Sequence, residues 1–446
     1  MGKSSYKDSF IRDLNPSKNW TMSKKANKER LRFGDAGVVN LRYIDYVNLS
    51  YVPEKDDLIC EFLVEPNGVS IEVAAGGIAA ESSIGTWTEL TTSKPYVEKI
   101  HAIVFEIFGK RIRVAYPDCL FEPGNMPNIL SSIAGNVFGL GALKNVRLSD
   151  VLFPAKVVRN FKGPRYGISG IRELLGVEER PLIGTIIKPK LGLRPKDHAK
   201  VAYEAWVGGC DLVKDDENLA NQSFNPFKER VARTLEMRRK AERESGVKKG
   251  YLANVTSETS QMIKRAQFVE DNGGRYAMID ILTAGFAALQ TLRDQDLNIV
   301  IHGHRAGHAA LTKNVRHGIS MRTLAKVSRI IGVDQLHVGS GVGKMSETKK
   351  DVLDSIVALK MAMHGLKPVL PVASGGLHPK LVPALLETFG KDFVIQAGGG
   401  VHGHRHGTIA GAKAMRQAVD ATLKGISLRK LAETHKELKI ALETWN

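Results

Sequence analysis

Residues 208–218 read GGCDLVKDDEN, in which a short apolar run meets a lysine and then three consecutive acidic residues. A buried strand seldom ends in clustered carboxylates for structural reasons alone, because like charges repel and desolvated carboxylates are costly. A hard divalent cation such as Mg²⁺ would resolve the conflict by binding carboxylate oxygens. Lys214 could join such a site only as a carbamate, formed from its amine and CO₂. A solvated turn is the alternative, and this stretch alone does not decide between the two.

The composition is that of an ordinary globular protein. The chain of 446 residues is long enough for two domains, and it contains 43% hydrophobic and 25% charged residues. No apolar run approaches the roughly 20 residues that span a bilayer, and the first ten residues lack the apolar segment of a secretory signal. Cys60, Cys119 and Cys210 are odd in number and scattered. We therefore expect no membrane partner, no disulfide framework and a cytoplasmic location.

The formal net charge of +17 is the unusual bulk property. It suits either nucleic-acid binding or an enzyme that acts on a multiply anionic small substrate. Residues 1–35 hold nine Lys/Arg against four Asp/Glu, but no basic platform interleaved with aromatic residues follows them. We predict a solvated basic leader over residues 1–35 and no nucleic-acid partner. An RNA or membrane-surface role for the leader is the alternative.

Two domains are predicted after the leader. Residues 36–160 have the size of a separate α+β domain, with strand patterns at 58–64 and 111–114 and helical spacing at 69–80 and 128–138. Residues 161–446 predict a (β/α)₈ TIM barrel, because eight short apolar runs recur, each followed by a helical segment, and the fold needs about 250 residues. A doubly wound sheet is the alternative. The runs lie at 182–187, 210–213, 251–255, 277–282, 299–301, 335–338, 369–373 and 394–397.

A barrel carries its chemistry at the C-terminal ends of its strands. Nearly every predicted strand ends in a residue of chemical use. These residues are Lys188 and Lys190; Lys214, Asp216 and Glu217; Asn254; Asp280; His304 and Arg305; His337; Ser374, Gly375 and Gly376; and Gly398, Gly399 and Gly400. Chance placement of polar residues would not produce this pattern, so it favours a site at residues 214–217 over a solvated turn. Asp215 points the other way along an extended chain and is expected to be structural.

Two groups of these residues indicate two phosphate sites. The glycines at 375–376 and 398–400 follow the last two strands, where barrels usually bind phosphate, and can offer several backbone N–H groups to one anion. Arg305 and His337 end strands across the barrel mouth from the last strand, and arginine suits phosphate through its planar fork of donors. Two such sites imply an extended bisphosphate. Tight turns and a satisfied core histidine are the alternatives.

Three further motifs have weaker signals. Lys188 lies in the sequence IKPK (187–190), and a base beside a metal-bound carbonyl can abstract a proton α to it and give an enediolate. Phosphate-steering lysines are the alternative there. The sequence GSGVGK (339–344) predicts a flexible lid with a cationic tip and lacks the spacing of a Walker loop. The tract HGHRH (402–406) is interpreted as a basic loop rather than a transition-metal site.

Together these motifs resemble the large subunit of ribulose-1,5-bisphosphate carboxylase/oxygenase (RuBisCO), in particular the archaeal-type form III or form II/III enzymes. The segments that carry the resemblance are AAESSIGTW (79–87), SIAGNVFG (132–139), GTIIKPKLGL (184–193), GGCDLVKDDEN (208–218), HGHRAGHA (302–309), HVGSGVGK (337–344), PVASGG (371–376) and IQAGGG (395–400). The resemblance implies carboxylation, and competing oxygenation by O₂, of ribulose-1,5-bisphosphate through a Mg²⁺-bound enediolate to give 3-phosphoglycerate. Met345-Ser346 and Gly307 depart from the family pattern and leave the CO₂/O₂ preference open.

The resemblance also implies roles for the catalytic residues. Lys214 would be carbamylated by CO₂ and would bind Mg²⁺ together with Asp216 and Glu217. Lys188 would abstract the C3 proton of the substrate, and Lys190 would support the enediolate.

Further roles implied by the resemblance concern proton transfer and substrate binding. His304 would assist proton transfers, and Lys344, paired with Glu81, would close over the site and stabilise the new carboxylate. The implied substrate-binding residues are Arg305, His337, Ser374, Gly375, Gly376, Gln396, Gly398 and Gly399, with Thr86, Trp87 and Asn136 reaching in from a neighbouring subunit. The working unit would therefore be a homodimer or higher homo-oligomer with shared active sites and no small subunit.

Two other functions are weighed against the carboxylase. If the protein were a RuBisCO-like enolase or isomerase of a sugar or thiosugar phosphate, we would expect substitutions at the lid lysine, at the phosphate-binding residues or at the site residues of the N-terminal domain. Lys344, Arg305, His337, Glu81 and Thr86 are all present, which favours a carboxylase. A basic nucleic-acid-binding protein would leave the residues at the strand ends unexplained.

Overall fold

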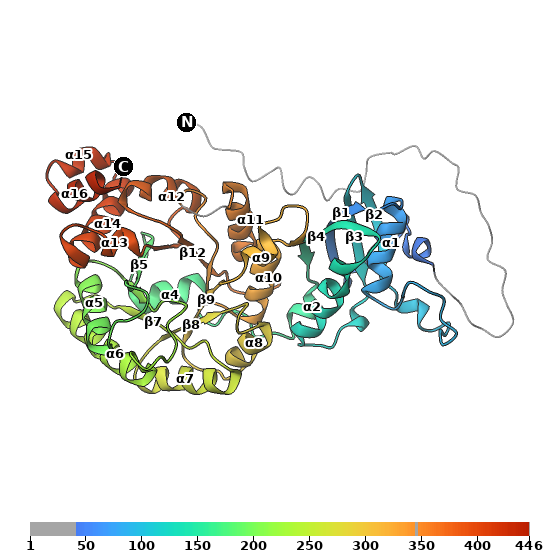
Figure 1. Ribbon diagram of the computed structural model, residues 1–446, viewed down its shortest axis with the longest axis horizontal. Helices are drawn as coiled ribbons and strands as arrows, with labels where there is room; N and C mark the ends of the chain where they lie inside the picture. Colours follow the sequence, from blue (N-terminus) through green and yellow to red (C-terminus); the bar gives the residue numbers. More distant parts are fainter. Residues whose placement is uncertain (1–41, 344–346, 446) are drawn as a thin grey trace.

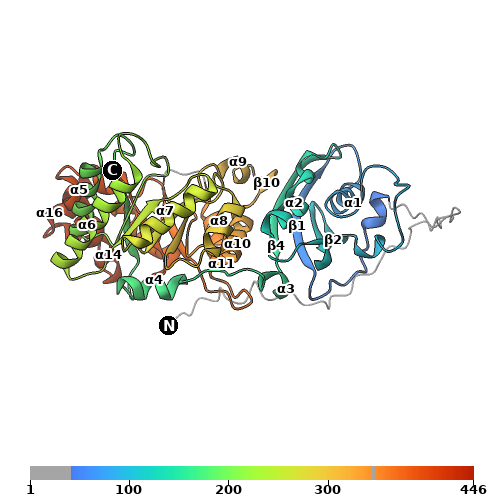
Figure 2. The same cartoon turned by 90° about the horizontal axis from the view of Figure 1, so that it is seen from below.

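The computed structural model describes residues 42–343 and 347–445. The predicted leader over residues 1–35 and the lid lysine Lys344 lie outside the described residues. The described chain forms an N-terminal sheet domain and a barrel domain, which lie at opposite ends of the molecule (Figure 1 and Figure 2).

The N-terminal domain is built on a sheet with the strand order β10-β4-β1-β3-β2. Strand β1 pairs antiparallel with both β3 and β4, and helix α1 begins at Ser70, whose hydroxyl accepts a hydrogen bond from the backbone N–H of Val73. The predicted strands and helices at 58–64, 111–114, 69–80 and 128–138 correspond to β1, β3, α1, and α2 with η5. The bounds are β1 (Leu58–Pro66), α1 (Ile71–Glu81), β2 (Ile103–Phe108), β3 (Arg111–Tyr116), α2 (Met126–Ala134), η5 (Asn136–Gly139) and β4 (Leu143–Leu152).

The C-terminal domain is a closed parallel barrel, as the sequence predicted. Its strand order is β11-β12-β13-β5-β6-β7-β8-β9, and each of the eight apolar runs found in the sequence overlaps one strand of this barrel. All residues of β7 and β8 are buried, because helices cover the outside of the barrel while side chains fill its interior. The strands are β5 (Leu182–Ile186), β6 (Leu212–Lys214), β7 (Gly250–Asn254), β8 (Tyr276–Asp280), β9 (Val300–His304), β11 (Gln335–His337), β12 (Leu370–Ser374) and β13 (Val394–Gln396).

Helices alternate with the barrel strands and surround them (Figure 1). Within the described ranges, no helix is both long enough and apolar enough to cross a membrane. The helices that precede, separate and follow the strands are α3 (Ala155–Val158), α4 (Gly167–Leu175), α5 (Pro195–Val207), α6 (Phe227–Ser245), α7 (Thr259–Asp271), α8 (Phe286–Asp294), α9 (Ala309–Thr312), α10 (Met321–Ile331), α11 (Lys349–Lys360), α12 (Val382–Phe389), α13 (Gly399–His402), α14 (Gly407–Leu423), α15 (Leu428–Ala432) and α16 (Lys436–Thr444).

One short strand joins the two domains. Strand β10 (Gly318–Ile319) follows β9 in the chain but pairs in parallel with β4 of the N-terminal sheet. The adjacent helix α10 is tied to the same strand, since the buried Lys326 Nζ lies 2.5 Å from Asp150 Oδ1 and donates to the carbonyl of Val151 at 2.9 Å. A segment inside the barrel sequence therefore completes the N-terminal sheet.

Candidate active site

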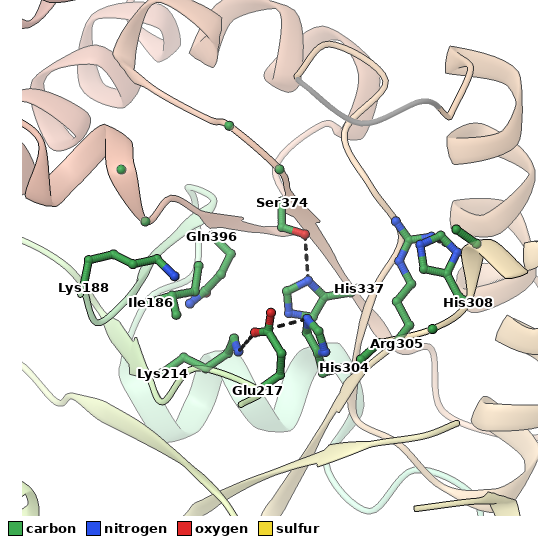
Figure 3. Close-up of a pocket in the computed structure, with 17 residues that line it drawn as sticks. Ile186, Lys188, Lys214, Glu217, His304, Arg305, His308, His337, Ser374 and Gln396 are labelled. Carbon is green, nitrogen blue, oxygen red and sulfur yellow. Dashed lines mark hydrogen bonds and ion pairs between the residues drawn. The ribbon is translucent and has the colours of Figure 1, made fainter. Parts of the chain in front are cut away.

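A cavity of about 500 Å³ opens where the barrel strands end. The last residues of β6, β9, β11, β12 and β13 all line it, as expected for the C-terminal mouth of a barrel (Figure 3). The predicted site residues that line it are Lys188, Lys214, Glu217, His304, Arg305, His337, Ser374, Gly375, Gly376, Gln396, Gly398 and Gly399. Sequence reasoning assigned no site role to the other lining residues, which are Ile186, Ala306, Gly307, His308 and Ala309, although it noted Gly307 as a departure from the family pattern.

Lys214 lies at the floor of this cavity and is almost fully buried. Its Nζ donates to the backbone carbonyl of Asp215 at 2.8 Å and lies 3.0 Å from the sulfur of Met278. Glu217 Oε2 is 3.6 Å from the same Nζ. Burial lowers the pKa of Lys214, although the neighbouring Glu217 carboxylate acts in the opposite direction. A lower pKa increases the fraction of neutral amine, which is the form that reacts with CO₂.

Asp216 lies directly behind the cavity wall and is paired with a lysine. Lys188 Nζ is 2.7 Å from Asp216 Oδ2, and the Lys188 side chain is 36% exposed while that of Asp216 is 2% exposed. Figure 3 shows Lys188 on the opposite side of the cavity from Arg305. Lys190 lies exposed in the loop after β5 and is not among the residues that line the cavity.

Asp215 points away from the cavity into a buried polar cluster. Its carboxylate lies 3.0 Å from His198 Nε2 and 3.1 Å from Arg230 Nε, and it accepts from Tyr251 OH at 2.7 Å and from the backbone N–H of Asn254 at 3.0 Å. Burial would raise the pKa of Asp215, but the charge of Arg230 and the hydrogen bond from His198 outweigh it and hold the pKa well below its usual range. Asp215 therefore anchors the chain between the two residues that face the other way.

Asn254, the last residue of β7, fixes the loop that carries Glu217. Its Nδ2 donates to the backbone carbonyls of Glu217 at 3.0 Å and Leu219 at 3.1 Å. The sequence pointed to Asn254 as a strand end with chemical use. Its contacts give it a structural task, which is to position the carboxylate loop.

His304 is oriented by Asp280, at the end of the neighbouring strand. The distance from His304 Nδ1 to Asp280 Oδ1 is 2.6 Å, and His304 Nε2 lies 3.6 Å from Glu217 Oε2. Asp280 also accepts from the backbone N–H of Ala306 at 2.9 Å. Burial raises the pKa of Asp280, but the hydrogen bond with His304 outweighs it and lowers this pKa. The second nitrogen of His304 thus faces the residues around Lys214.

Arg305 forms an ion pair with a carboxylate that the sequence did not reveal. Arg305 Nη2 donates to Glu347 Oε1 at 2.6 Å, and His308 Nε2 lies 3.5 Å from the same oxygen. Burial and the charge of Arg305 lower the pKa of His308 to about 4. Only the spacing HRAGH (304–308) hinted at His308, and nothing in the sequence connected Glu347, 42 residues from Arg305, with this end of the cavity.

Gln396 is one of the residues that line the cavity. The residue is buried, and neither polar atom of its amide has a hydrogen-bond partner among the described residues. A buried amide without partners is costly, and because both atoms are covered, the side chain would have to turn before it could bind a molecule in the cavity. Gly184 on β5 makes room for this side chain, because a methyl group there would overlap the amide oxygen.

The tract at 402–406 differs from the predicted basic loop. His402 ends α13 and is held between threonines, with Nε2 2.9 Å from Thr185 Oγ1 and Nδ1 3.1 Å from Thr408 Oγ1. Burial lowers the pKa of His402 to about 4, so it is uncharged at neutral pH. His404 is buried and faces the backbone carbonyl of Glu437. The prediction of a basic loop is therefore wrong for these two residues, because packing against α14 and α16 buries His404 and half-buries His402.

The predicted residues of the N-terminal domain lie outside the cavity. Glu81 Oε1 accepts a hydrogen bond from Tyr43 OH at 2.7 Å, and Thr86 lines a smaller hollow in the same domain. Trp87 is 81% exposed, and Asn136 is exposed at the start of η5. A single chain does not bring these four residues to the barrel mouth (Figure 1).

The chemistry of the residues around Lys214 fits a magnesium ion once the lysine is modified. The part of the chain that the structure describes holds no group of three or more His, Cys, Asp or Glu side chains arranged to bind a metal. Asp216 and Glu217 supply two carboxylates beside Lys214. Mg²⁺ requires oxygen ligands and is commonly bound through one or two carboxylates, so a carbamate on Lys214 would add the missing acidic ligand.

Comparisons with known sequences show to which family the chain is similar. Family models match the chain over residues 45–157 (ribulose bisphosphate carboxylase large chain, N-terminal domain) and 167–445 (the catalytic domain of the same chain). The ribulose bisphosphate carboxylase of Methanocaldococcus jannaschii is 50% identical over 426 residues, which cover 90% of this chain and 100% of that protein. That of Pyrococcus abyssi is 50% identical over 409 residues, which cover 90% and 96%.

Solved structures give the same result. Octameric RuBisCO from Pyrococcus horikoshii OT3 superposes with a TM-score of 0.88 at 49% identity, covering 91% of this chain and 97% of that chain. Dimeric archaeal RuBisCO from Hyperthermus butylicus gives a TM-score of 0.84 at 46% identity, covering 91% and 99%. These similarities confirm the resemblance, including its archaeal character, that the sequence motifs indicated. The chain therefore belongs to the ribulose bisphosphate carboxylase large-chain family.

Proposed function

We propose that this protein carboxylates ribulose-1,5-bisphosphate, with O₂ as a competing reactant, on a site centred on a carbamylated Lys214. The observation that carries the proposal is the buried Lys214 amine in the cavity, which lies 3.6 Å from Glu217 Oε2 and two residues before Asp216 in the chain. Family membership supports the activity, and the geometry supports the assignment of residues.

Activation of Lys214 by CO₂ is the first step. The lone pair of the neutral amine attacks the carbon of CO₂, an N–C bond forms, one C=O π pair moves onto oxygen, and the nitrogen loses a proton to solvent. The product carries an anionic group where an ammonium would stand, so the sequence KDDE gains one more acidic oxygen ligand, and a divalent cation would balance the resulting like charges. Lys214, Asp216 and Glu217 would then hold Mg²⁺, which when bound polarises a substrate carbonyl and stabilises negative charge on its oxygen.

Substrate would lie across the cavity between two anion-binding ends. Arg305 and His337 line one side, and the backbone N–H groups of Gly376, Gly398 and Gly399 line the other. Glu347 must yield its place on Arg305 to a phosphate, because both anions compete for one guanidinium. Gln396 supplies the unpaired amide to the molecule between the two ends.

Lys188 is the base assigned to the C3 proton of the substrate. Its Nζ would leave Asp216, 2.7 Å away, when that carboxylate turns to the metal, and would then face the cavity. His304, oriented by Asp280, would relay protons beside Glu217. Lys190 would support the enediolate, and Lys344 would close over the site and stabilise the new carboxylate.

The proposed working unit is a homo-oligomer of at least two chains without a small subunit, acting in a reducing cytoplasm. The archaeal relatives of known structure are described as octameric and dimeric. The exposed Trp87 and Asn136 would contribute, with Thr86 and Glu81, to the cavity of a neighbouring chain. The three cysteines are free thiols, in keeping with a reducing compartment.

Labelled bicarbonate tests the proposal directly. The protein is incubated with ribulose-1,5-bisphosphate and Mg²⁺, and acid-stable label is counted for the wild type, Lys214→Met and Lys249→Met. We expect incorporation by the wild type, none by Lys214→Met, and retention by Lys249→Met, because Lys249 is a buried lysine whose Nζ donates to the carbonyl of Cys210 away from the cavity.

Three results would contradict the proposal or part of it. An absence of acid-stable label from the wild type would remove the carboxylase activity. Exchange of the C3 proton with solvent in the absence of carboxylation would instead indicate an enolase or isomerase on the same scaffold. Full activity of Lys214→Met would leave the carboxylase standing and overturn the role of this lysine.

A further inference from the structure

A row of hydrogen bonds runs behind the cavity wall and ends at Ser374. Gln335 Oε1 lies 2.8 Å from His302 Nδ1, and His302 Nε2 lies 2.8 Å from His337 Nε2. His337 Nδ1 in turn lies 2.8 Å from Ser374 Oγ. The row crosses three adjacent strands, since β11 pairs with both β9 and β12. Only His337 and Ser374 reach the cavity, so Gln335 and His302 lie in the layer behind it (Figure 3).

Both histidines of this row are neutral. Burial lowers the pKa of His302 and of His337 well below 6.5. Both residues are almost fully buried, so a positive charge on either ring would be poorly solvated. A neutral imidazole carries one N–H donor and one lone-pair acceptor. If one ring nitrogen donates a hydrogen bond, the other must therefore accept one.

Gln335 decides which partner donates in each hydrogen bond of the row, because its side-chain carbonyl oxygen can only accept. His302 must then carry its hydrogen on Nδ1 and a lone pair on Nε2. That lone pair requires a hydrogen on Nε2 of His337, which leaves the lone pair of His337 on Nδ1. The hydroxyl of Ser374 must therefore donate to His337, and only the lone pairs of Oγ remain for the cavity.

We propose that Gln335 and His302 are positioning residues that fix the tautomer of His337 and thereby present Ser374 to the substrate as a hydrogen-bond acceptor. An acceptor attracts a substrate hydroxyl and repels a phosphate oxygen. The next two residues, Gly375 and Gly376, offer backbone N–H donors, which do the reverse. Neighbouring positions of one turn thus distinguish a hydroxyl from a phosphate. This inference rests on the proposed function, in which the substrate is a sugar bisphosphate.

The site has one alternative polarity. Turning the Gln335 amide by 180° would direct its Nε2 at His302 and reverse every donor in the row. Ser374 would then accept from His337 and offer its own hydrogen to the cavity, so that it would favour a phosphate oxygen. The positions of two hydrogens, one on each imidazole, distinguish the two polarities.

Neutron diffraction from deuterium-exchanged crystals of the full-length protein measures those positions and does not depend on turnover. We expect deuterium on Nδ1 of His302 and on Nε2 of His337. Deuterium on the opposite nitrogens, or on both nitrogens of either ring, would overturn the proposal while leaving the carboxylase activity untouched.

Kinetics of Gln335→Met test the consequence at the site. Methionine has a similar length but no carbonyl, so it releases the tautomers without opening a large cavity. We expect the KM for ribulose-1,5-bisphosphate to rise about five- to tenfold, the loss of roughly one hydrogen bond to the substrate, with a smaller change in kcat. Trapping of labelled CO₂ on Lys214 should not change, because Lys214 is not a member of the row.

Gln417→Met is the matched control. Gln417 is a part-buried glutamine on α14 that hydrogen-bonds Leu438 and Glu437 outside the cavity. Its substitution should leave the KM unchanged. Two results would reject a positioning role and indicate a purely structural one. The first is an unchanged KM in Gln335→Met, and the second is a rise in KM accompanied by equally large losses of kcat and CO₂ trapping.

Discussion

The role of each charged residue in the sequence KDDE depends on the direction in which its side chain points. Lys214 and Asp216 turn toward the barrel mouth, whereas Asp215 between them turns into the cluster with His198, Arg230 and Tyr251. Alternation along an extended chain predicted this split. The partners of Asp215 could not be predicted, since they come from α5, α6 and β7 and meet only in the folded barrel.

Arg230→Met tests the anchor at Asp215. The guanidinium is fully buried, so its removal leaves an uncompensated buried carboxylate and should lower the free energy of unfolding by about 3–5 kcal/mol. Chemical denaturation measures the loss. Arg233→Met on the same helix is the control: Arg233 pairs with Glu229 in solvent, with both side chains 49% exposed, and should cost less than about 1 kcal/mol. Equal losses in the two variants would contradict the anchor.

His402 should make the protein sensitive to acid. Its pKa is about 4 in the folded chain against 6.5 when unfolded, so between these values the unfolded state binds more protons. The contribution of His402 to the free energy of unfolding is therefore fully present above pH 6.5. It falls as the pH drops toward 4, by at most about 3 kcal/mol.

The variant His402→Gln should show a smaller loss of stability between pH 7 and pH 4.5 than the wild type, as followed by unfolding in urea at each pH. The exposed His406 provides the control, and His406→Gln should keep the wild-type slope. Parallel pH profiles of wild type and His402→Gln would mean that His402 does not contribute.

At the scale of elements, apolar runs predicted the barrel well because parallel strands are buried on both faces and read as continuous hydrophobic stretches. Strands β2 and β4 were not predicted. Strand β4 reads LKNVRLSDVL, with polar residues facing solvent and the domain junction, and its burial alternates irregularly. Strand β10 has two residues and exists only through its pairing with β4, so no local pattern could reveal it.

Gly184→Ala tests the packing of β5 against Gln396. The added methyl group overlaps the flexible end of the Gln396 side chain, which can move away at little cost in stability. We expect kcat/KM to fall about tenfold, as the loss of about 1.4 kcal/mol of binding to the substrate would give, with a melting temperature close to that of the wild type.

Gly250→Ala supplies the contrast. Gly250 begins β7, at the end of the barrel away from the cavity, and a methyl group there would press on Leu212 and Tyr276. This variant should lose thermal stability while its folded fraction keeps the wild-type kcat/KM. If Gly184→Ala lost stability and kept its kcat/KM, Gln396 would not be a substrate ligand.

At the scale of the whole molecule, four of the predicted site residues lie apart from the cavity of their own chain. Glu81, Thr86, Trp87 and Asn136 sit in the N-terminal domain, at the other end of the molecule from the barrel mouth (Figure 2). Motifs placed these residues in the family pattern, but only geometry shows that they do not meet the cavity of their own chain. Glu347, His302 and Gln335 were not predicted, because their roles depend on tertiary contacts. His302 lies in the segment HGHRAGHA, which gave it no role, and the other two lie outside the quoted motifs.

Subunit complementation tests a shared site. Lys214→Ala disables the barrel and Glu81→Gln disables the N-terminal contribution, so each homodimer should be inactive. Dissociation, mixing and reassociation would give mixed dimers in which one of two sites joins an intact barrel to an intact N-terminal domain. Random mixing of a two-fold dimer makes about half the dimers mixed, so we expect about a quarter of wild-type carboxylation.

The readout is incorporation of labelled CO₂ before and after mixing. Mixing Lys214→Ala with a second barrel variant, Lys188→Met, is the control and should restore nothing if Lys188 and Lys214 serve the same cavity. Activity of the unmixed Glu81→Gln protein at the wild-type level, or no recovery on mixing two variants that each assemble, would contradict the shared site.

Strand β10 limits how this chain can evolve. It belongs to the barrel by sequence and to the N-terminal sheet by pairing, with Gly318 opposite Arg147 and Ile319 opposite Leu148. A cut between the domains leaves β10 without a partner on one fragment and exposes the edge of β4 on the other, and unpaired edges promote aggregation. Recombination that exchanges one domain with a relative must therefore preserve this register to keep β10 paired.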